Sequence, residues 1–229
     1  MEVGKFMGIL YIVGTPIGNL KDITLRALEI LKEVDLILAE DTRVTKKLLA
    51  HFGIKKPVER YDEYAKEKVY AAVADLLKRG QNIALVTDAG TPAISDPGSK
   101  LVNFIQNELP EVKIIPIPGS SALTTALSVS GLNADKFTFL GYPPHKKGRQ
   151  TFFKKLKDVE IKPIVIYESP HRLQKTLTGL AEILGENYEI VVAKELTKIH
   201  EEIWHGSIVE AKKYFEGQKG KGEFVIIVP

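Results

Sequence analysis

The stretch IALVTDAGTPAISDPGS, residues 83–99, decides the fold of this chain. It opens with the apolar run Ile83–Val86, which predicts a buried strand. Small and polar residues follow with one carboxylate, Asp88, and a turn at residues 95–98 then precedes a helix. Because open α/β sheets bind ligands where a loop leaves the carboxyl end of a parallel strand, the stretch predicts a ligand near Asp88. The alternative is an ordinary strand-to-helix turn, in which Asp, Gly and Pro are the expected residues.

Strand and helix patterns alternate from the start of the chain to this stretch and beyond it. Apolar runs predict strands at residues 9–13, 34–39, 83–86 and 112–117. Amphipathic patterns predict helices at 22–31, from Asp41 or Thr42 to Gly53, at 66–78 and at 99–107, with Asp22 as the N-cap of the first. This alternation predicts a parallel sheet covered on both faces.

The second half carries a different pattern. It predicts strands at 136–141, 163–167, 189–193, 201–205 and 222–228, the fourth at a sheet edge because it alternates. Helices are expected after Pro118, at Pro170 with Ser169 as N-cap, and at 207–215 with a Ser207–Glu210 capping box. The proline-flanked segment at 116–119 is the best boundary, giving domains 1–117 and 118–229.

Composition excludes several classes of function. The 229 residues include 32 basic and 29 acidic residues, so any RNA site must be a local patch. There is no cysteine, which excludes disulfides and thiolate chemistry, and five scattered histidines give little support to a metal site. No apolar run is long enough for a membrane span and no signal peptide opens the chain, so we expect a cytoplasmic protein that does not contact membranes.

Three further segments offer polar groups at the ends of elements. Glu40 and Asp41 stand beside Arg43 at a strand's carboxyl end, which suits a catalytic cluster, although Asp41 can also simply cap the next helix. Ser121 and Ala122 open a helix whose free N–H groups suit an anionic ligand group, or are merely capped. After the first strand, the glycines at 14 and 18 match neither a dinucleotide fingerprint nor a P-loop.

A basic loop with a flanking tyrosine lies at residues 142–149. It contains His145, Lys146, Lys147 and Arg149, a set that can grip phosphates. The alternative is a solvated surface loop, because most short charge runs are solvated.

Together these segments resemble the tetrapyrrole (corrin/porphyrin) methylase superfamily, and within it the branch that methylates small-subunit ribosomal RNA. The resemblance covers residues 9–228 and is carried by motifs in the family's order: LYIVGTPIGNL, ILAEDTR, VTDAGTPAISDPG, PGSSALTTALSVSGL, FLGYPP, YESPHR, AKELTK and KGEFVIIV. The corrin and porphyrin branch typically carries Gly-x-Gly-x-Gly-Asp after the first strand. Residues 14–19 read GTPIGN instead, which favours the ribosomal branch.

The resemblance implies two α/β domains, with a parallel sheet in the first and a mixed sheet in the second, a ligand cleft between them and a homodimer. It implies S-adenosylmethionine as the methyl donor, no metal, and transfer to the ribose 2′-oxygen of a decoding-centre cytidine in 16S rRNA, alone or in the small subunit. The implied donor-binding residues are Pro16, Asp88, Gly90, Thr91, Ser121, Ala122, Tyr167 and Gly222. RNA docking would use His145, Lys146, Lys147 and Arg149, with Arg43 and Arg172 nearer the cleft.

The chemical step needs one base or one cation near the reacting hydroxyl, because a ribose hydroxyl is a poor nucleophile. One candidate is Lys194 with Glu195, which follow an apolar strand and are expected on a loop; the other is Glu40 or Asp41 with Arg43. Lys194 and Glu195 can equally form a surface ion pair. Two other functions stay open: methylation of a small tetrapyrrole, and non-catalytic nucleotide binding by a ribosome-associated protein.

Overall fold

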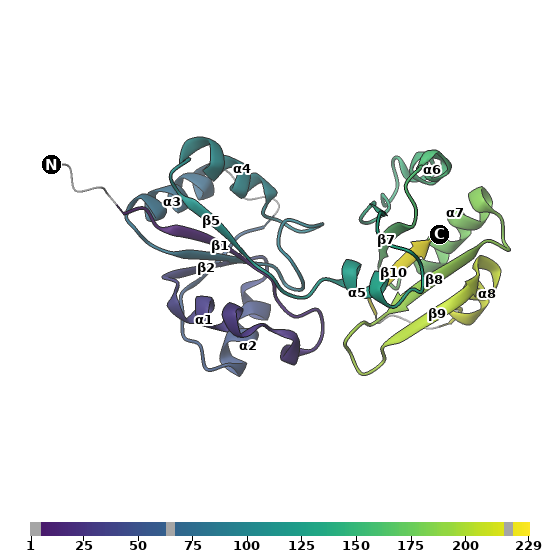
Figure 1. Cartoon of the computed structure of the whole chain (residues 1–229), viewed down its shortest axis with the longest axis horizontal. Helices are drawn as coiled ribbons and strands as arrows, with labels where there is room; N and C mark the ends of the chain where they lie inside the picture. Colours follow the sequence, from purple (N-terminus) through teal and green to yellow (C-terminus); the bar gives the residue numbers. More distant parts are fainter. Residues whose placement is uncertain (1–5, 63–66, 218–221) are drawn as a thin grey trace. The chain divides into compact units, whose positions relative to one another are not determined.

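The structure is a computed structural model that describes residues 6–62, 67–217 and 222–229. The chain divides into two compact units, Met1–Ser121 and Ala122–Pro229 (Figure 1). The division falls four residues after the position expected from the sequence. Each unit has a five-stranded sheet of its own.

The first unit is built on a parallel sheet with the strand order β3-β2-β4-β1-β5. Its strands are β1 (Ile9–Val13), β2 (Leu36–Ala39), β3 (Val58–Arg60), β4 (Ile83–Val86) and β5 (Lys113–Ile117). Its helices are the 3₁₀ turn η1 (Leu20–Asp22), α1 (Leu25–Glu33), α2 (Thr42–His51), α3 (Glu67–Lys78) and α4 (Ser99–Glu108). The parallel sheet predicted from the alternation is confirmed.

Helices cover both faces of this sheet, as the sequence predicts. Figure 1 shows α1 and α2 on one side of the strands and α3 and α4 on the other. Leu31 and Leu49 pack with Ile37 on the first side, whereas Leu77 and Leu101 belong to the core on the second. The central strands β2 and β4 are therefore buried on both sides, which explains their continuous apolar runs.

Two details of the first unit differ from the sequence prediction. Asp22 ends the 3₁₀ turn, and the N-cap of α1 is Thr24, whose Oγ1 accepts a hydrogen bond from the Ala27 N–H at 3.1 Å. The edge strand β3 was not predicted, because it is short and largely exposed and carries no apolar run. Lys66, expected to open the third helix, lies outside the described residues; Asp41 does cap α2, as predicted.

The second unit is built on a mixed sheet with the strand order β6-β7-β10-β8-β9, in which β6–β7 is the parallel pair and the other neighbours are antiparallel. Its strands are β6 (Thr138–Phe139), β7 (Ile164–Glu168), β8 (Glu189–Lys194), β9 (Glu202–Ser207) and β10 (Phe224–Val228). Its helices are α5 (Ala122–Ser128), α6 (Arg149–Lys155), the 3₁₀ turn η2 (Leu156–Asp158), α7 (Leu173–Leu184) and α8 (Ile208–Tyr214). The mixed sheet and the edge position of β9 are confirmed.

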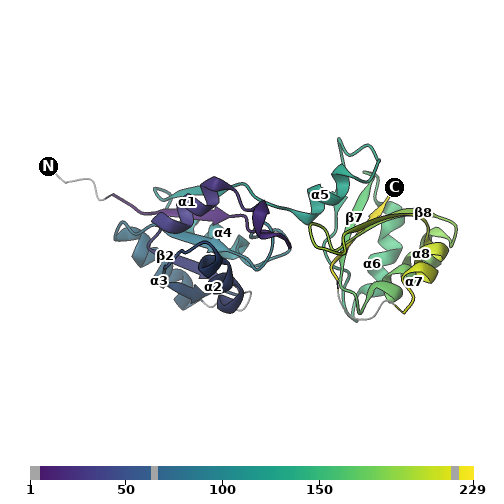
Figure 2. The same ribbon diagram turned by 90° about the horizontal axis from the view of Figure 1, so that it is seen from below.

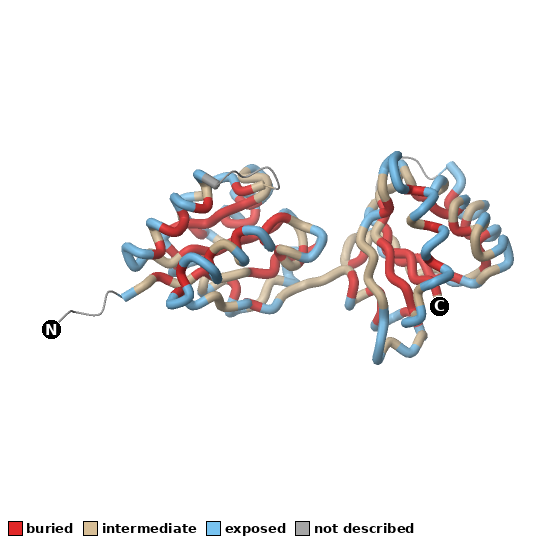
Figure 3. The backbone as a smooth tube through the Cα atoms, turned by 90° about the horizontal axis from the view of Figure 1, so that it is seen from above, coloured by how far each residue is buried: buried red, intermediate tan, exposed pale blue. Residues whose placement is uncertain are grey.

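The two faces of this sheet have different cover. In Figures 1 and 2, α6, α7 and α8 lie on one side of the strands and α5 lies on the other. Ile166, Ile226 and Val192 pack in the core under α7 and α8. Their neighbours along each strand point to the opposite face, because strand side chains alternate. Figure 3 shows these central strands buried along their length.

Two sequence predictions in the second unit are wrong, and one is confirmed. Ser169 and Pro170 do not open α7, which begins at Leu173; the Ser169 carbonyl instead accepts hydrogen bonds from the Arg172 and Leu173 N–H groups in a preceding turn. The strand expected at 136–141 is reduced to two residues. The capping box of α8 forms: Ser207 Oγ accepts from the Glu210 N–H, and the Glu210 carboxylate accepts from the Ser207 N–H.

Candidate active site

The loops that the sequence singles out in the first unit all leave the same edge of its sheet. Because its strands are parallel, β1, β2, β4 and β5 end together, at Val13, Ala39, Val86 and Ile117. Open α/β sheets bind ligands along such an edge.

Hydrogen bonds hold three of these loops together. Thr15 and Gly90 exchange two backbone hydrogen bonds, of 2.8 and 3.0 Å, and Thr15 Oγ1 donates to the Thr87 carbonyl at 3.1 Å. Thr91 Oγ1 donates to the Ser120 carbonyl at 3.3 Å. The predicted donor-binding residues Gly90 and Thr91 therefore lie in a fixed backbone, and Pro16, next to Thr15, is buried.

Gly14 and Gly119 bring the loops after β1 and β5 into direct backbone contact. A Cβ added to Gly119 would lie 2.8 Å from the carbonyl carbon and oxygen of Gly14, and a Cβ on Gly14 would lie 2.8 Å from the Cα of Gly119. Neither position has room for a side chain, so the contact requires glycine in both loops.

Gly119→Ala is expected to lower the free energy of unfolding of the first unit by about 1–3 kcal/mol, because the methyl group must push the Gly14 loop away. Urea denaturation measures this change. Ser120→Ala is the matched control, since its hydroxyl makes a long hydrogen bond of 3.4 Å to the Asp22 carbonyl. Equal stability of Gly119→Ala and the control would contradict the close contact.

A pocket of about 620 Å³ opens at the same edge. Its lining comes from the ends of β2, β3 and β4 and is almost wholly charged: Glu40, Asp41, Thr42, Arg43, Arg60, Asp62 and Asp88. It brings together four residues that the sequence predicts, namely Glu40, Asp41, Arg43 and Asp88. It adds Arg60 and Asp62, which form an ion pair of 2.8 Å and were not predicted because they follow the unrecognised strand β3.

The four carboxylates of this pocket are in different states. The Arg43 guanidinium binds Asp41 at 2.5–3.1 Å and holds the pKa of that carboxyl well below its usual range. Asp88 Oδ1 accepts from the Asp41 N–H at 3.0 Å, and desolvation raises the pKa of Asp88. Glu40 accepts from the Thr87 hydroxyl at 2.8 Å. Asp41 is thus neutralised by an arginine, whereas Glu40 is held by a neutral hydroxyl.

Backbone strain marks two loops among the predicted site motifs. Within the described residues, the non-glycine residues with positive φ are Ala93 and Ser95 after β4, and Glu195 and Thr197 after β8. Such conformations cost about 1–3 kcal/mol each and cluster at functional sites. The strain therefore supports functional roles for both the DAGTPAISDPG and AKELTK segments.

In the second unit, Tyr167 lies beside the start of α5. Its hydroxyl accepts a hydrogen bond from the Leu123 N–H at 2.9 Å, so one of the helix N–H groups expected to bind a ligand is already engaged. Phe139 and Tyr142 pack edge-on against the Tyr167 ring, at centroid distances of 4.8 and 5.6 Å. Ser121 and Ala122 immediately precede Leu123 and are half-buried.

Lys194 and Tyr167 lie on opposite faces of the second sheet. Lys194 is the last residue of β8 and not part of a loop. It lies in one row with Phe224 and Glu168, and this row points to the face of the sheet that α6, α7 and α8 cover. Its Nζ lies 3.8 Å from the Glu202 carboxylate and 6.0 Å from the centre of the Phe215 ring. Tyr167 belongs to the next row and faces the other side.

Glu195 and Gly222 come together beyond the end of β8. The Glu195 carboxylate accepts from the Lys198 ammonium at 2.7 Å and from the Glu223 N–H at 3.1 Å. Burial acts to raise the pKa of Glu195, but Lys198 and the Glu223 N–H outweigh it, so the pKa lies below its usual value. A Cβ on Gly222 would lie 3.5 Å from Glu195 Cγ.

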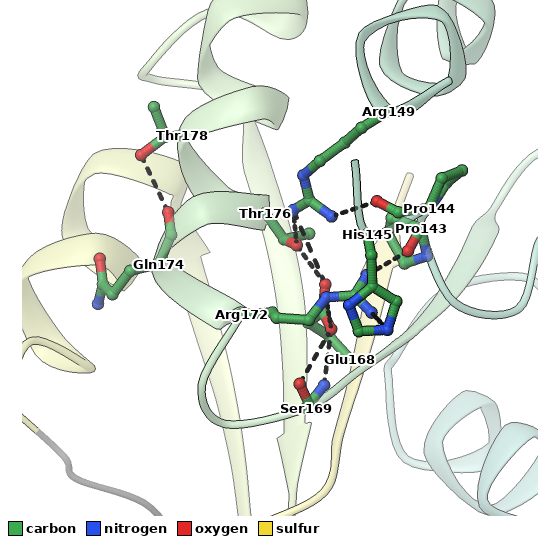
Figure 4. Close-up of polar contacts among 10 residues, drawn as sticks. All are labelled: Pro143, Pro144, His145, Arg149, Glu168, Ser169, Arg172, Gln174, Thr176 and Thr178. Carbon is green, nitrogen blue, oxygen red and sulfur yellow. Dashed lines mark hydrogen bonds and ion pairs between the residues drawn. The ribbon is translucent and has the colours of Figure 1, made fainter. Parts of the chain in front are cut away.

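A buried carboxylate organises the basic loop (Figure 4). Glu168 is fully buried and forms ion pairs with Arg149 at 3.9 Å and Arg172 at 3.2 Å. It also accepts hydrogen bonds from the Thr176 hydroxyl and, at 2.8 Å, from the Ser169 N–H.

The two arginines connect Glu168 to the loop itself. Arg149 donates to the Pro144 carbonyl at 3.1 Å, and Arg172 donates to the Pro143 carbonyl and contacts His145 Nε2 at 3.1 Å. Burial lowers the pKa of Arg149 and the Glu168 charge opposes that shift. Two of the residues predicted to bind RNA, Lys146 and Lys147, take no part in this network, and both are exposed.

The sequence contains a signal for this network that periodicity reasoning missed. Glu168 has the same strand parity as Ile164 and Ile166, so it points into the core, where a carboxylate needs a cationic partner. Arg172 follows four residues later and supplies one. Arg149 and Thr176 come from other elements, and no local pattern pairs them with Glu168.

The described residues contain neither a metal-holding cluster nor a membrane-spanning helix. No group of three or more His, Asp or Glu side chains is arranged to hold a metal ion in the part of the chain that the structure describes. No helix within residues 6–62, 67–217 and 222–229 has the length and apolar character needed to cross a membrane.

Comparisons with known proteins identify the class and then the family. A crystal structure of diphthine synthase shares the fold, with a TM-score of 0.71 and 18% identity over 96% of this chain and 90% of that one. Residues 9–212 match the family Tetrapyrrole (Corrin/Porphyrin) Methylases. The chain belongs to this family, and by class it is a methyltransferase.

Two curated relatives are much more similar in sequence. The ribosomal RNA small subunit methyltransferase I of Thermotoga maritima is 49% identical over 222 residues, which are 97% of this chain and 98% of the relative. The protein of the same name from Synechocystis sp. is 48% identical over 97% of this chain and 79% of its own length.

Proposed function

We propose that this protein transfers a methyl group from S-adenosylmethionine to the ribose 2′-oxygen of a decoding-centre cytidine in small-subunit rRNA. The observation that carries the proposal is the near-full-length identity of 49% to a relative named as a small-subunit rRNA methyltransferase. The small subunit or its rRNA would be the partner, and the resemblance adds a homodimer.

The residues at the sheet edge of the first unit fit such a donor. S-adenosylmethionine carries a sulfonium, an ammonium and ribose hydroxyls, all of which favour carboxylates as neighbours. Asp88 offers a carboxylate there, and the glycines at 14 and 119 let the loops after β1 and β5 pack backbone to backbone at the same edge. When bound, the donor supplies an electrophilic methyl group.

The reaction exchanges one bond for another. A C–O bond forms to the ribose oxygen, the C–S bond of the donor breaks with its electron pair going to sulfur, and the hydroxyl proton leaves to a base. The protein aligns the two partners, an effect worth up to about 7–11 kcal/mol. In the proposal Glu40 is the group that holds the departing proton, because its carboxylate is bound by the neutral Thr87 hydroxyl and pairs with no cation among the described residues.

RNA docking in this proposal falls to the exposed residues of the basic loop. Lys146 and Lys147 are exposed and free to meet phosphates. The other basic residues of the loop do not contact RNA directly in this proposal. Arg149 and Arg172 bind Glu168, and Arg172 contacts His145, so these side chains fix the loop that presents the two lysines.

A methylation assay tests the function directly. Purified protein, S-adenosylmethionine and small ribosomal subunits lacking the modification should yield 2′-O-methylcytidine, identified by mass spectrometry of the nucleosides. A product on a tetrapyrrole acceptor instead, or no turnover on any acceptor, would overturn the proposal.

Asp88→Ala is expected to weaken S-adenosylmethionine binding at least tenfold, about 1.4 kcal/mol, in a calorimetric titration. Asp88→Asn separates charge from structure, because its amide oxygen can still accept the Asp41 N–H. Glu29→Ala, an exposed carboxylate on α1, is the control. Unchanged affinity in both Asp88 variants would remove this side chain from the donor site.

A further inference from the structure

A groove of about 520 Å³ runs between α6 and α7 in the second unit. Its floor exists because α7 has a glycine where α6 presents a phenylalanine. A Cβ on Gly179 would lie 2.7 Å from the Phe153 ring, so the missing side chain lets the ring sink to 4% exposure. The helices therefore pack closely below and leave a trough above, which we call the α6–α7 groove.

The rim of the α6–α7 groove is cationic. Lys146, Lys154 and Lys175 line it, and all three are exposed. None of them forms an ion pair within the described residues. Glu182 is the one acidic residue among the lining residues, and Arg149 at the base is already paired with Glu168. The groove thus has an unbalanced positive charge.

This charge is local, as an RNA site on this chain must be. The whole chain has a formal charge of only +3, but residues 145–158 contain six Lys and Arg against a single acidic residue. The groove begins at Lys146, which also belongs to the basic loop, and it continues along α6 to Lys154. It is therefore continuous with the surface already proposed to meet RNA.

We propose that the α6–α7 groove binds the phosphodiester backbone of the rRNA next to the segment that the basic loop contacts. The inference rests on the proposed function and extends its docking surface by Lys154 and Lys175. Lysines act as point charges on phosphates and do not read base identity. Gln150 also lines the groove and can donate hydrogen bonds to phosphate oxygens, whereas the Thr178 hydroxyl already donates to the Gln174 carbonyl at 2.9 Å. The groove consequently supplies affinity and register, and sequence choice lies elsewhere.

Charge-removing variants test the groove. The double variant Lys154→Gln/Lys175→Gln is compared with Lys212→Gln/Lys213→Gln, which removes the same charge from α8. The probe is the unmodified small ribosomal subunit, and its dissociation constant is measured between about 50 and 200 mM salt. The groove variant should bind about tenfold more weakly at low salt, and its log–log salt slope should flatten by about 1.4–1.8, because each of the two lost phosphate contacts removes about 0.7–0.9.

Two further readouts separate this proposal from the proposed function. S-adenosylmethionine affinity and kcat at saturating subunits should match the unaltered protein, since neither lysine touches the first unit's pocket. Equal salt slopes in the two double variants would overturn the groove proposal, and methylation by the unaltered protein would then still support the proposed function. If the unaltered protein does not methylate the subunit at all, the proposed function itself is overturned.

Discussion

Replacing Glu168 with alanine is expected to lower the free energy of unfolding of the second unit by about 3–5 kcal/mol. The carboxylate is fully buried between two guanidinium groups, so its removal leaves both charges without a counter-ion. It also removes the acceptor for the Thr176 hydroxyl and the Ser169 N–H. Urea denaturation followed by circular dichroism measures the loss.

The same substitution should loosen the basic loop. Arg149 and Arg172 hold the carbonyls of Pro144 and Pro143, and both arginines lose their anchor when Glu168 is removed. Limited trypsin digestion should then cut faster after Lys146 and Lys147. Glu182→Ala, an exposed carboxylate on α7, is the control and should change stability by less than about 0.5 kcal/mol. A loss below about 1 kcal/mol in Glu168→Ala would show that the network adds no net stability.

Much of the fold follows from the sequence because its strands are buried on both faces. The runs at Ile83–Val86 and Ile9–Val13 are apolar throughout, as expected for strands of a parallel sheet that helices cover on both faces. The strand-end loops could be recognised for the same reason, since a polar cluster directly after such a run marks the ligand-binding edge. Glu40, Asp41, Arg43 and Asp88 were found in this way, and the structure brings them to one pocket.

Other elements could not be predicted, because their stability is tertiary. The strand β3 is three residues long and largely exposed, and its position depends on pairing with β2. Ser169 and Pro170 have the residue types of a helix start, but the Glu168 carboxylate accepts a hydrogen bond from the Ser169 N–H, and the helix begins only at Leu173. Local propensity is overruled there by a buried carboxylate.

The charged residues show the same limit. A run such as His145–Arg149 states how many cations are present, but not which of them are buried. Arg149 is 6% exposed and pairs with Glu168, nineteen residues away in the sequence, whereas its neighbours Lys146 and Lys147 are exposed. Only the packing of α6 against α7 separates the structural arginine from the surface lysines.

Glu40→Gln is expected to lower kcat about a hundredfold, the low end of the range for general acid–base catalysis, with both dissociation constants nearly unchanged. Glutamine keeps the shape and the hydrogen bond from the Thr87 hydroxyl but cannot take a proton. Single-turnover methylation at saturating subunits and donor measures the chemical step. In Asp41→Ala and Arg43→Ala, kcat should fall less than in Glu40→Gln, because Arg43 already keeps Asp41 ionised and paired, so Asp41 is a poor proton acceptor.

Lys194→Ala and Glu195→Ala provide the decisive comparison, because the sequence makes them equal candidates. Lys194 faces the helix-covered side of its sheet beside Glu202, and Glu195 is held by Lys198 and the Glu223 N–H with a lowered pKa. Both contacts disfavour proton transfer, so each variant should retain kcat within about tenfold, one decade short of the general-base effect. If these two variants lose a hundredfold and Glu40→Gln does not, the strained loop after β8 carries the chemistry and the first unit only binds the donor.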